Sequence, residues 1–96
     1  MAEEKFQCLN PHGKQGTNIA KHKYEQVKEV VLEVIASQQP IAFVDMAALA
    51  SEILQEQNFE GKPMWYVTTV KLDLEARKLI ERVPKTSPHQ LKLCGL

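Results

Sequence analysis

The stretch CLNPHGKQGTNI, residues 8–19, places a thiol, an imidazole, an ammonium group and two glycines close together. Such residue types could form a phosphate-binding loop. That loop needs Gly, four residues and then Gly-Lys-Ser/Thr, between a buried strand and a helix. Here Cys8 stands where the first glycine belongs, and Gln15 follows Lys14 where a Ser or Thr hydroxyl is required. No hydrophobic strand precedes the stretch. The pattern therefore does not predict a nucleotide site.

A metal site in this chain would have to use Cys8, His12, His22, His89 or Cys94. Zinc ligands usually come in pairs at short spacing, such as Cys-x2-Cys, and Cys8 with His12 makes one loose pair. Nucleophilic catalysis by cysteine and histidine needs the thiol beside a base in a cleft, for which a domain this small has little room. We therefore expect no catalytic residue, no metal ligand, no cofactor and no small-molecule substrate.

The same stretch also has a structural interpretation. Pro11 and the glycines fix turns, while Cys8 and Ile19 are apolar and can anchor both ends. We predict an irregular N-terminal arm over residues 1–18 that packs on the rest of the chain or bridges a dimer. A phosphate contact made by Lys14 is its remaining binding role.

The length and composition are those of one soluble domain. A chain of 96 residues, 44% hydrophobic and 25% charged, can build one modest core. No apolar run approaches the roughly 20 residues that span a bilayer, and the start MAEEKFQCLN lacks an apolar signal segment. We therefore predict a cytoplasmic protein without membrane contact, whose cysteines are reduced thiols.

The formal net charge is zero, but the charges are unevenly placed. Residues 5–24 carry +4, residues 25–60 carry −6 and residues 61–96 carry +4. Strong non-specific binding to nucleic acid grows with the number of phosphates neutralised, so a neutral total disfavours it. A locally basic binding face remains open, because both ends of the chain are basic.

Apolar residues at spacings of three and four predict three helices. Pro40 ends the first helix, Asp45 is expected to cap the second, and Pro63 suits the first position of the third. Two short alternating runs separated by the polar loop PKTSPH predict a β-hairpin. The expected elements are a helix at 19–37, an edge strand at 41–43, helices at 45–57 and 63–78, and strands at 79–83 and 90–94.

The segment VTTVKLDLEARKLIERV, residues 67–83, resembles the third helix and first wing strand of winged-helix proteins. Their pattern has apolar residues before a Leu-Glu pair, then a helix end, then Leu-Ile-x-Arg, matched here by Leu74-Glu75 and by Leu79 to Arg82. Lys78 stands where many members have a left-handed glycine, and lysine adopts that conformation at modest cost.

The resemblance covers about residues 19–94. It implies an α+β fold, mostly α: a winged helix-turn-helix of three helices plus a small antiparallel β-hairpin wing. The predicted organisation is an arm at 1–18 and a winged-helix domain at 19–96. The whole chain also resembles a small uncharacterised bacterial family with segments like CLNPHGKQGTNI and WYVTTVKLDLEARKLIERVPKT, and that resemblance implies no activity.

In DNA-binding helix-turn-helix proteins the recognition helix enters the major groove. With Val67, Val70 and Leu74 facing the core, the outward residues are expected to be Trp65, Thr68, Thr69, Leu72 and Asp73, with Lys71 and Arg77 on the flanks. Direct readout favours Arg, Lys, Asn and Gln. This face is poor in them, and Asp73 would repel phosphate.

Two hypotheses follow, and neither involves an enzyme. The first is a transcription-regulator-like module that binds double-stranded DNA, with a homodimer as its expected assembly. Its candidate contacts are Thr68, Thr69, Lys71, Arg82, Lys85, Lys92 and Lys14. The alternative is a protein-interaction or dimerisation module that uses Trp65 and Leu72. Trp65 and Tyr66 also have a structural interpretation, in which they complete the core or a dimer interface. The wing's charges have a second interpretation, as a solvated hairpin protected against edge-to-edge pairing.

Overall fold

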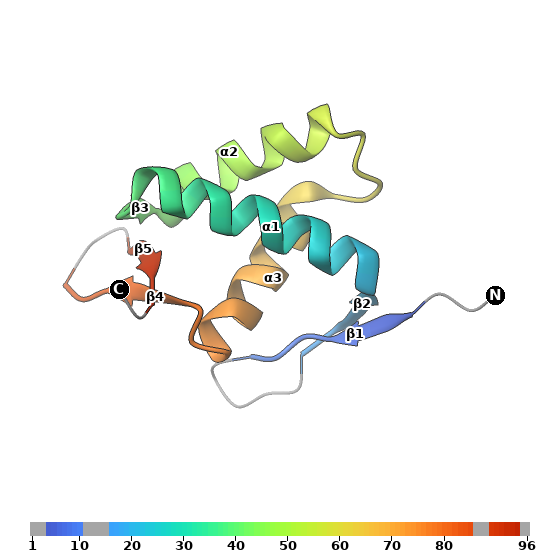
Figure 1. The fold of residues 1–96 in the computed structure, drawn as a ribbon, viewed down its shortest axis with the longest axis horizontal. Coiled ribbons are helices and arrows are strands. Elements are labelled where there is room, and N and C mark those ends of the chain that lie inside the picture. Colours follow the sequence, from blue (N-terminus) through green and yellow to red (C-terminus); the bar gives the residue numbers. More distant parts are fainter. Residues whose placement is uncertain (1–3, 11–15, 86–88, 95–96) are drawn as a thin grey trace.

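The computed structural model describes residues 4–10, 16–85 and 89–94 of the chain. Three helices, α1 (Lys21–Gln38), α2 (Phe43–Glu56) and α3 (Pro63–Ala76), pack against one another, and a small sheet closes one end of the group (Figure 1). The predicted class, α+β and mostly α with a β-hairpin wing, is confirmed. Within the described residues, no helix is both long enough and apolar enough to cross a bilayer.

The first helix follows the predicted apolar periodicity. Tyr24, Val27 and Val31 are among its buried residues. The helix ends at Gln38, because Pro40 keeps Gln39 in an extended conformation. It begins later than residue 19, since Asn18–Ala20 form a strand instead.

The sheet consists of β3 (Ile41–Ala42), β5 (Gln90–Leu93) and β4 (Ile80–Val83), in that spatial order and all antiparallel. The strands β4 and β5 are the predicted hairpin, and β3 is the predicted brief edge strand. Leu91, on the central strand, pairs with both Ile41 and Arg82. The sheet therefore ties the connection between α1 and α2 to the segment that follows α3.

The boundaries of α2 and α3 differ slightly from the prediction. The second helix begins at Phe43, so Asp45 lies in its first turn rather than at its cap. Phe43 already donates its N–H to the His89 carbonyl, at 3.1 Å, where the β3 pairing ends. The third helix ends at Ala76, and Lys78 adopts φ +62°, as expected for a residue in the closing left-handed position.

The arm is more regular than expected. Lys5–Gln7 (β1) and Asn18–Ala20 (β2) pair as antiparallel strands beside the start of α1 (Figure 1). Three-residue strands are too short to show an alternating pattern, so the sequence did not reveal them. The second of these strands crosses the predicted boundary between arm and domain. Lys14 lies outside the described residues.

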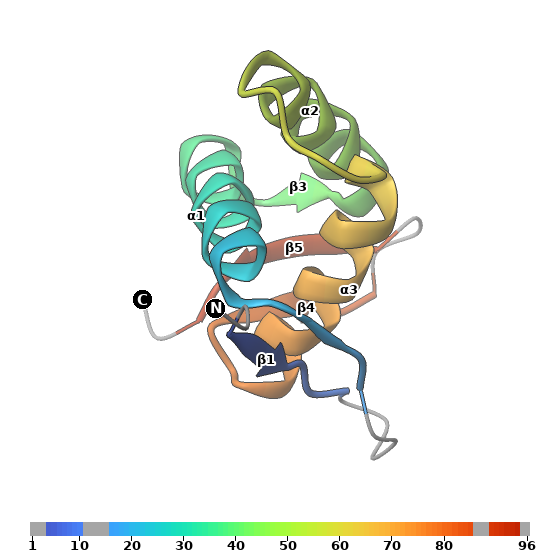
Figure 2. The same cartoon turned by 90° about the vertical axis from the view of Figure 1, so that its right-hand side faces the viewer.

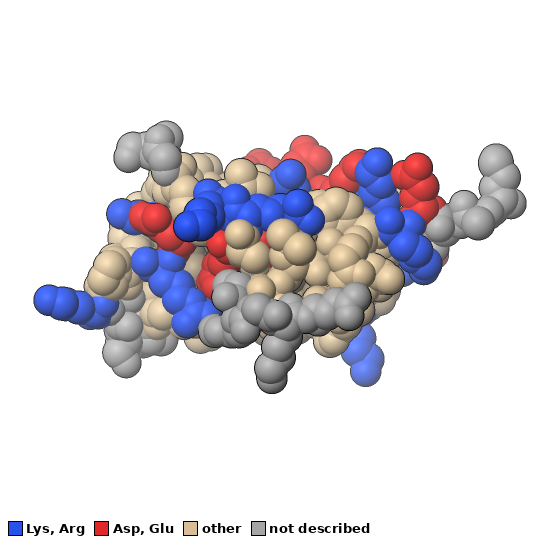
Figure 3. Space-filling view, turned by 90° about the horizontal axis from the view of Figure 1, so that it is seen from below, with Lys and Arg blue, Asp and Glu red and all other residues tan. Residues whose placement is uncertain are grey.

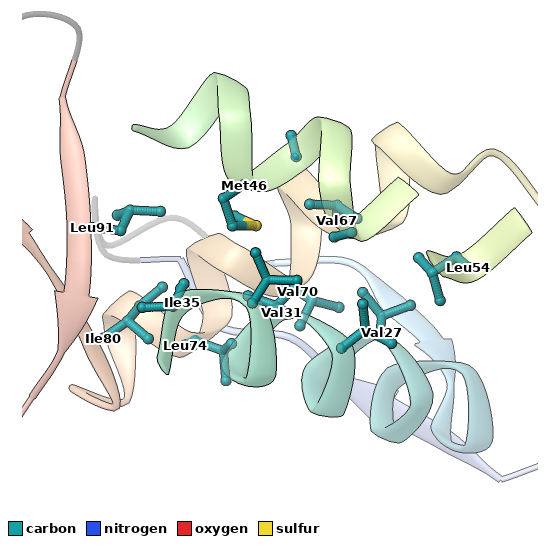
Figure 4. Close-up of a cluster of buried hydrophobic side chains, with 14 of the residues drawn as sticks. Val27, Val31, Ile35, Met46, Leu54, Val67, Val70, Leu74, Ile80 and Leu91 are labelled. Carbon is teal, nitrogen blue, oxygen red and sulfur yellow. The ribbon is translucent and has the colours of Figure 1, made fainter. Parts of the chain in front are cut away.

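The core lies between the three helices and the sheet (Figure 4). Its fully buried side chains come from every layer: Val27, Val31 and Ile35 of α1, Met46 and Leu54 of α2, Val67, Val70 and Leu74 of α3, and Ile80 and Leu91 of the sheet. Phe59, in the turn before α3, packs against this core as predicted.

Candidate nucleic-acid interface

The C-terminal half of α3 is covered by the arm through a buried carboxylate. Asp73 is 0% exposed and accepts hydrogen bonds from the Tyr24 hydroxyl at 2.5 Å, the Leu9 N–H at 2.8 Å and Arg77 Nε at 2.9 Å. The expectation that Asp73 faces solvent is wrong. Its donors come from the arm, from α1 and from the residue that follows α3, so no single stretch of sequence reveals them.

Further contacts hold the arm in place. The Arg77 guanidinium lies 4.8 Å from the Phe6 ring centroid, and Phe6 stacks on Tyr24 at 3.8 Å. Cys8 donates its N–H to the Thr17 carbonyl at 3.0 Å. A Cβ on Gly16 would lie 2.0 Å from the Cys8 carbonyl oxygen, so this close approach requires glycine. The described residues of the stretch 8–19 therefore contribute to the fold.

The thiol of the arm is not poised for chemistry. Cys8 is 1% exposed, and burial, with the nearby Asp73 carboxylate, raises its pKa to about 11. Burial and the hydrogen bond to Asp73 also raise the pKa of Tyr24. Because the thiolate is the nucleophile, Cys8 is inert near neutral pH. Both Cys8 and Cys94 are free thiols.

Lys71 is not on the flank of α3, as the sequence led us to expect, but buried. Its Nζ lies 2.8 Å from Glu75 Oε1 and 4.9 Å from the Phe43 ring centroid. Burial lowers the pKa of Lys71, and Glu75 opposes that effect. Packing of α3 against the hairpin and the start of α2 encloses this side chain, so its ammonium group is not available to a duplex in this conformation.

The basic residues of the hairpin are exposed but partly neutralised. Arg82 Nε lies 3.3 Å from Glu75 Oε1, and Lys92 Nζ lies 3.2 Å from Glu81 Oε1. Lys85 is exposed and forms no ion pair within the described part of the chain. Figure 3, a view from below, shows basic side chains at several places on this face, with acidic side chains between them and along its upper edge.

A shallow depression of about 450 Å³ lies between the end of α3 and the hairpin. Its lining includes Glu75, Lys78, Glu81, Arg82 and Cys94. The Cys94 thiol donates to Glu81 Oε2 at 3.6 Å, and burial and this carboxylate raise the pKa of Cys94. The charges balance and the thiol stays protonated, so the depression offers no activated nucleophile. Among the described residues, no three His, Cys, Asp or Glu side chains gather as metal ligands would.

The N-terminal half of α3 is not covered by the described arm. Met64 is 51% exposed and Trp65 is 45% exposed. Thr68 is exposed, with its hydroxyl bonded to the Met64 carbonyl at 2.9 Å, while Thr69 and Leu72 are half-buried. This face carries no charged side chain. The N-terminal end of α3 lies on the same side of the molecule as the ends of β4 and β5 that lead to their connecting loop (Figure 2).

One group of aromatic side chains with a lysine, around Tyr66, was not expected from the sequence. The Tyr66 ring lies 5.0 Å from Trp65 and 5.0 Å from Phe59, perpendicular to both. Lys23 Nζ lies 5.5 Å from the Tyr66 centroid and 6.0 Å from that of Phe59. We call Lys23, Phe59, Trp65 and Tyr66 the aromatic–lysine cluster. Phe59, Trp65 and Tyr66 are close in the sequence and so could have suggested an aromatic group. Lys23 is remote in the sequence, and nothing local links it to them.

One family model matches residues 5–91, nearly the whole chain, and it is described as a family of unknown function, DUF6958. No curated protein and no solved structure matches the chain. The match includes both the arm and the three helices, which agrees with the arm being an integral part of the fold.

Proposed function

Because the chain belongs to DUF6958, a family of unknown function, we propose its function from geometry: a non-enzymatic winged-helix protein that binds DNA. In this proposal α3 lies in the major groove of a duplex and the β4–β5 hairpin contacts the backbone, as in a small transcription regulator. The observation that carries the proposal is the uncovered N-terminal half of α3, with Thr68 exposed and Trp65 45% exposed. A recognition helix needs that half free, since its first residues contact base edges.

The burial of Asp73 supports the proposal. The sequence placed this carboxylate on the outward face, where it would repel phosphate. It is 0% exposed and compensated by Arg77, so the outward face of α3 is neutral. Thr68 and Thr69 then supply polar contacts, and the apolar side chain of Met64 suits the thymine methyl group.

The hairpin supplies the phosphate contacts. Lys85 is exposed, and Arg82 and Lys92 are about half exposed in their ion pairs. The Lys92–Glu81 pair is exposed on both sides and contributes only about 0–1 kcal/mol, so Lys92 can exchange its carboxylate for a phosphate. Arg82 can do the same, because Glu75 keeps its ion pair with Lys71. Such contacts position a duplex without reading its sequence. With no forked donor on α3, we expect modest sequence discrimination.

A binding titration tests this function. A labelled duplex should bind at about 50 mM salt and release as the salt rises to about 200 mM. Thr68→Glu adds an acid to the proposed face and should weaken binding at least about tenfold by phosphate repulsion. Ala48→Glu is the matched control, because residue 48 is exposed on α2. Absence of binding at low salt, or equal effects of both changes, would refute the proposal.

The apolar character of the same face favours a second function, binding to another protein. Met64, Trp65 and the half-buried Leu72 form an uncharged stripe along α3, and such a stripe suits contact with another protein, here a second copy of the chain. Sedimentation over a range of concentrations tests this. A dimer that Trp65→Ala dissociates, in a protein that binds no duplex, would replace the first proposal by this one.

A further inference from the structure

Trp65 presents a partly exposed indole ring. It is 45% exposed, and its ring contact within the described chain, with Tyr66, is nearly perpendicular, at 81°. A perpendicular contact uses either the edge of the indole or one of its faces. At least one face of Trp65 is therefore not covered by Tyr66 and can accept a flat partner.

The indole is held in place by the rest of the aromatic–lysine cluster. Tyr66 also contacts Phe59, which packs against the core. Gly61, between them in sequence, has φ +122°, and a Cβ there would lie 2.7 Å from Tyr66 Cε2. The turn before α3 is thus shaped around the Tyr66 ring. A rigid aromatic platform loses little conformational entropy when a ligand stacks on it.

Positive charge accompanies this platform. Lys23 Nζ and the Trp65 ring centroid both lie within 5.5 Å of the Tyr66 centroid. Lys62 is exposed at the cap position of α3, three residues before Trp65. Glu60, in the same turn, is the neighbouring acid, so the local balance favours an anionic partner only modestly. Aromatic rings with adjacent cations are the combination that binds stacked bases and their phosphates.

We infer that the aromatic–lysine cluster is a stacking site for an unpaired base of single-stranded DNA, with Lys23 and Lys62 contacting the flanking phosphates. This inference rests on the proposed DNA binding and adds the kind of strand that the protein prefers. In a duplex each base face is covered by its neighbours, so an indole can stack only on a base that is unpaired or at an end. An apolar protein partner would not use the two lysines.

The intrinsic fluorescence of Trp65, the only tryptophan in the chain, gives a direct measurement. The full-length protein is titrated with a blunt duplex, with the same duplex carrying a single-stranded thymine tail, and with a thymine oligonucleotide. Stacking should quench the indole with the tailed duplex and the oligonucleotide, and should tighten binding of the tailed over the blunt duplex.

Variants separate stacking from charge, with labelled DNA as the probe. Trp65→Ala should weaken binding of the thymine strand by about 5- to 100-fold, the range for loss of one stacked base, whereas Trp65→Phe should restore most of it. Leu79→Ala, which also truncates an exposed apolar side chain (39% exposed), should have no effect.

Lys23→Gln should reduce the slope of log affinity against log salt by about 0.7, as expected for one phosphate contact on a single strand. Lys28→Gln is its matched control, because Lys28 Nζ lies 5.9 Å from another tyrosine ring, that of Tyr24. Its slope should equal that of the parent.

The outcomes distinguish the inference from the function on which it rests. Equal binding of blunt and tailed duplexes without quenching would overturn the stacking site and leave duplex binding intact. Failure of all three DNAs to bind would overturn both. A loss of thymine-strand binding in Trp65→Ala that Trp65→Phe does not restore would also contradict stacking, because phenylalanine keeps an aromatic face.

Discussion

The two ends of α3 contrast in what covers them. At the C-terminal end, Asp73 is 0% exposed and Lys71 is 4% exposed. At the N-terminal end, Met64 and Trp65 are 51% and 45% exposed. This inverts the usual distribution, in which charged residues face water and large apolar residues face the core.

Both departures have a physical meaning. A buried charge persists only when it is paired and hydrogen-bonded, and Asp73 has donors from three segments of the chain. It therefore reports how the arm is attached. An exposed indole has no such compensation within the described chain, and so it is the better indicator of a binding surface.

Asp73→Ala should destabilise the fold by about 3–5 kcal/mol, because it leaves the buried Tyr24 hydroxyl, the part-buried Leu9 N–H and the Arg77 guanidinium without their acceptor. Urea unfolding measures the effect. The control is Asp45→Ala, at an exposed carboxylate in the first turn of α2, where we expect a loss of at most about 1 kcal/mol. Equal losses would show that the arm is not attached through Asp73.

Gly16→Ala should cost about 3 kcal/mol, since the added methyl group would meet the Cys8 carbonyl oxygen at 2.0 Å and backbone must move. Thermal unfolding compares it with Thr17→Ala, an exposed neighbour whose backbone carbonyl is retained. If both variants melted together, the close approach of the two arm segments would be absent in solution.

Alkaline pH should weaken the covered end. The pKa of Cys8 is raised from 9.0 to about 11 in the folded chain, so the unfolded chain loses this proton first. The stabilisation that the buried, protonated thiol gives the folded state is complete below pH 9 and disappears as the pH rises towards 11. The free energy of unfolding then falls by about 2 kcal/mol. Cys8→Ala should lose less stability over that range than the parent, measured by urea unfolding at each pH. Identical pH profiles would mean that the thiol is not buried.

Trp65→Ala should change stability by no more than about 0.5 kcal/mol, because the indole is largely outside the core. Val67→Ala, two residues further along α3 at a fully buried position, should cost about 1–3 kcal/mol through lost burial and a cavity. Unfolding midpoints measured side by side test the pair. A large loss in Trp65→Ala would place the indole in the core or in a stable dimer interface, and would remove the contrast between the two ends.

Much of the fold was predictable from sequence. Pro40 and Pro63 fixed where α1 ends and α3 begins, and apolar spacing located the three helices and the hairpin. The paired strands of the arm were not predictable, because they depend on one another across ten residues of turn-forming sequence. Of the candidate site, the exposure of Trp65 and Thr68 was foreseen, whereas Lys23 joins the cluster only through the packing of α1 against α3.

The sequence of α3 does not determine which face of the helix points into the core; its packing in the folded chain does. The helix has apolar residues on nearly every side, including Met64, Trp65, Tyr66, Val67 and Leu72, so periodicity fits more than one inward face. The residues of this segment are enough to predict a helix, begun by a proline and followed by a hairpin. Only the arm, α1 and the hairpin, which supply the partners of Asp73 and Lys71, determined which charges are buried. A polar group is buried where its partners are, and those partners lie far along the chain.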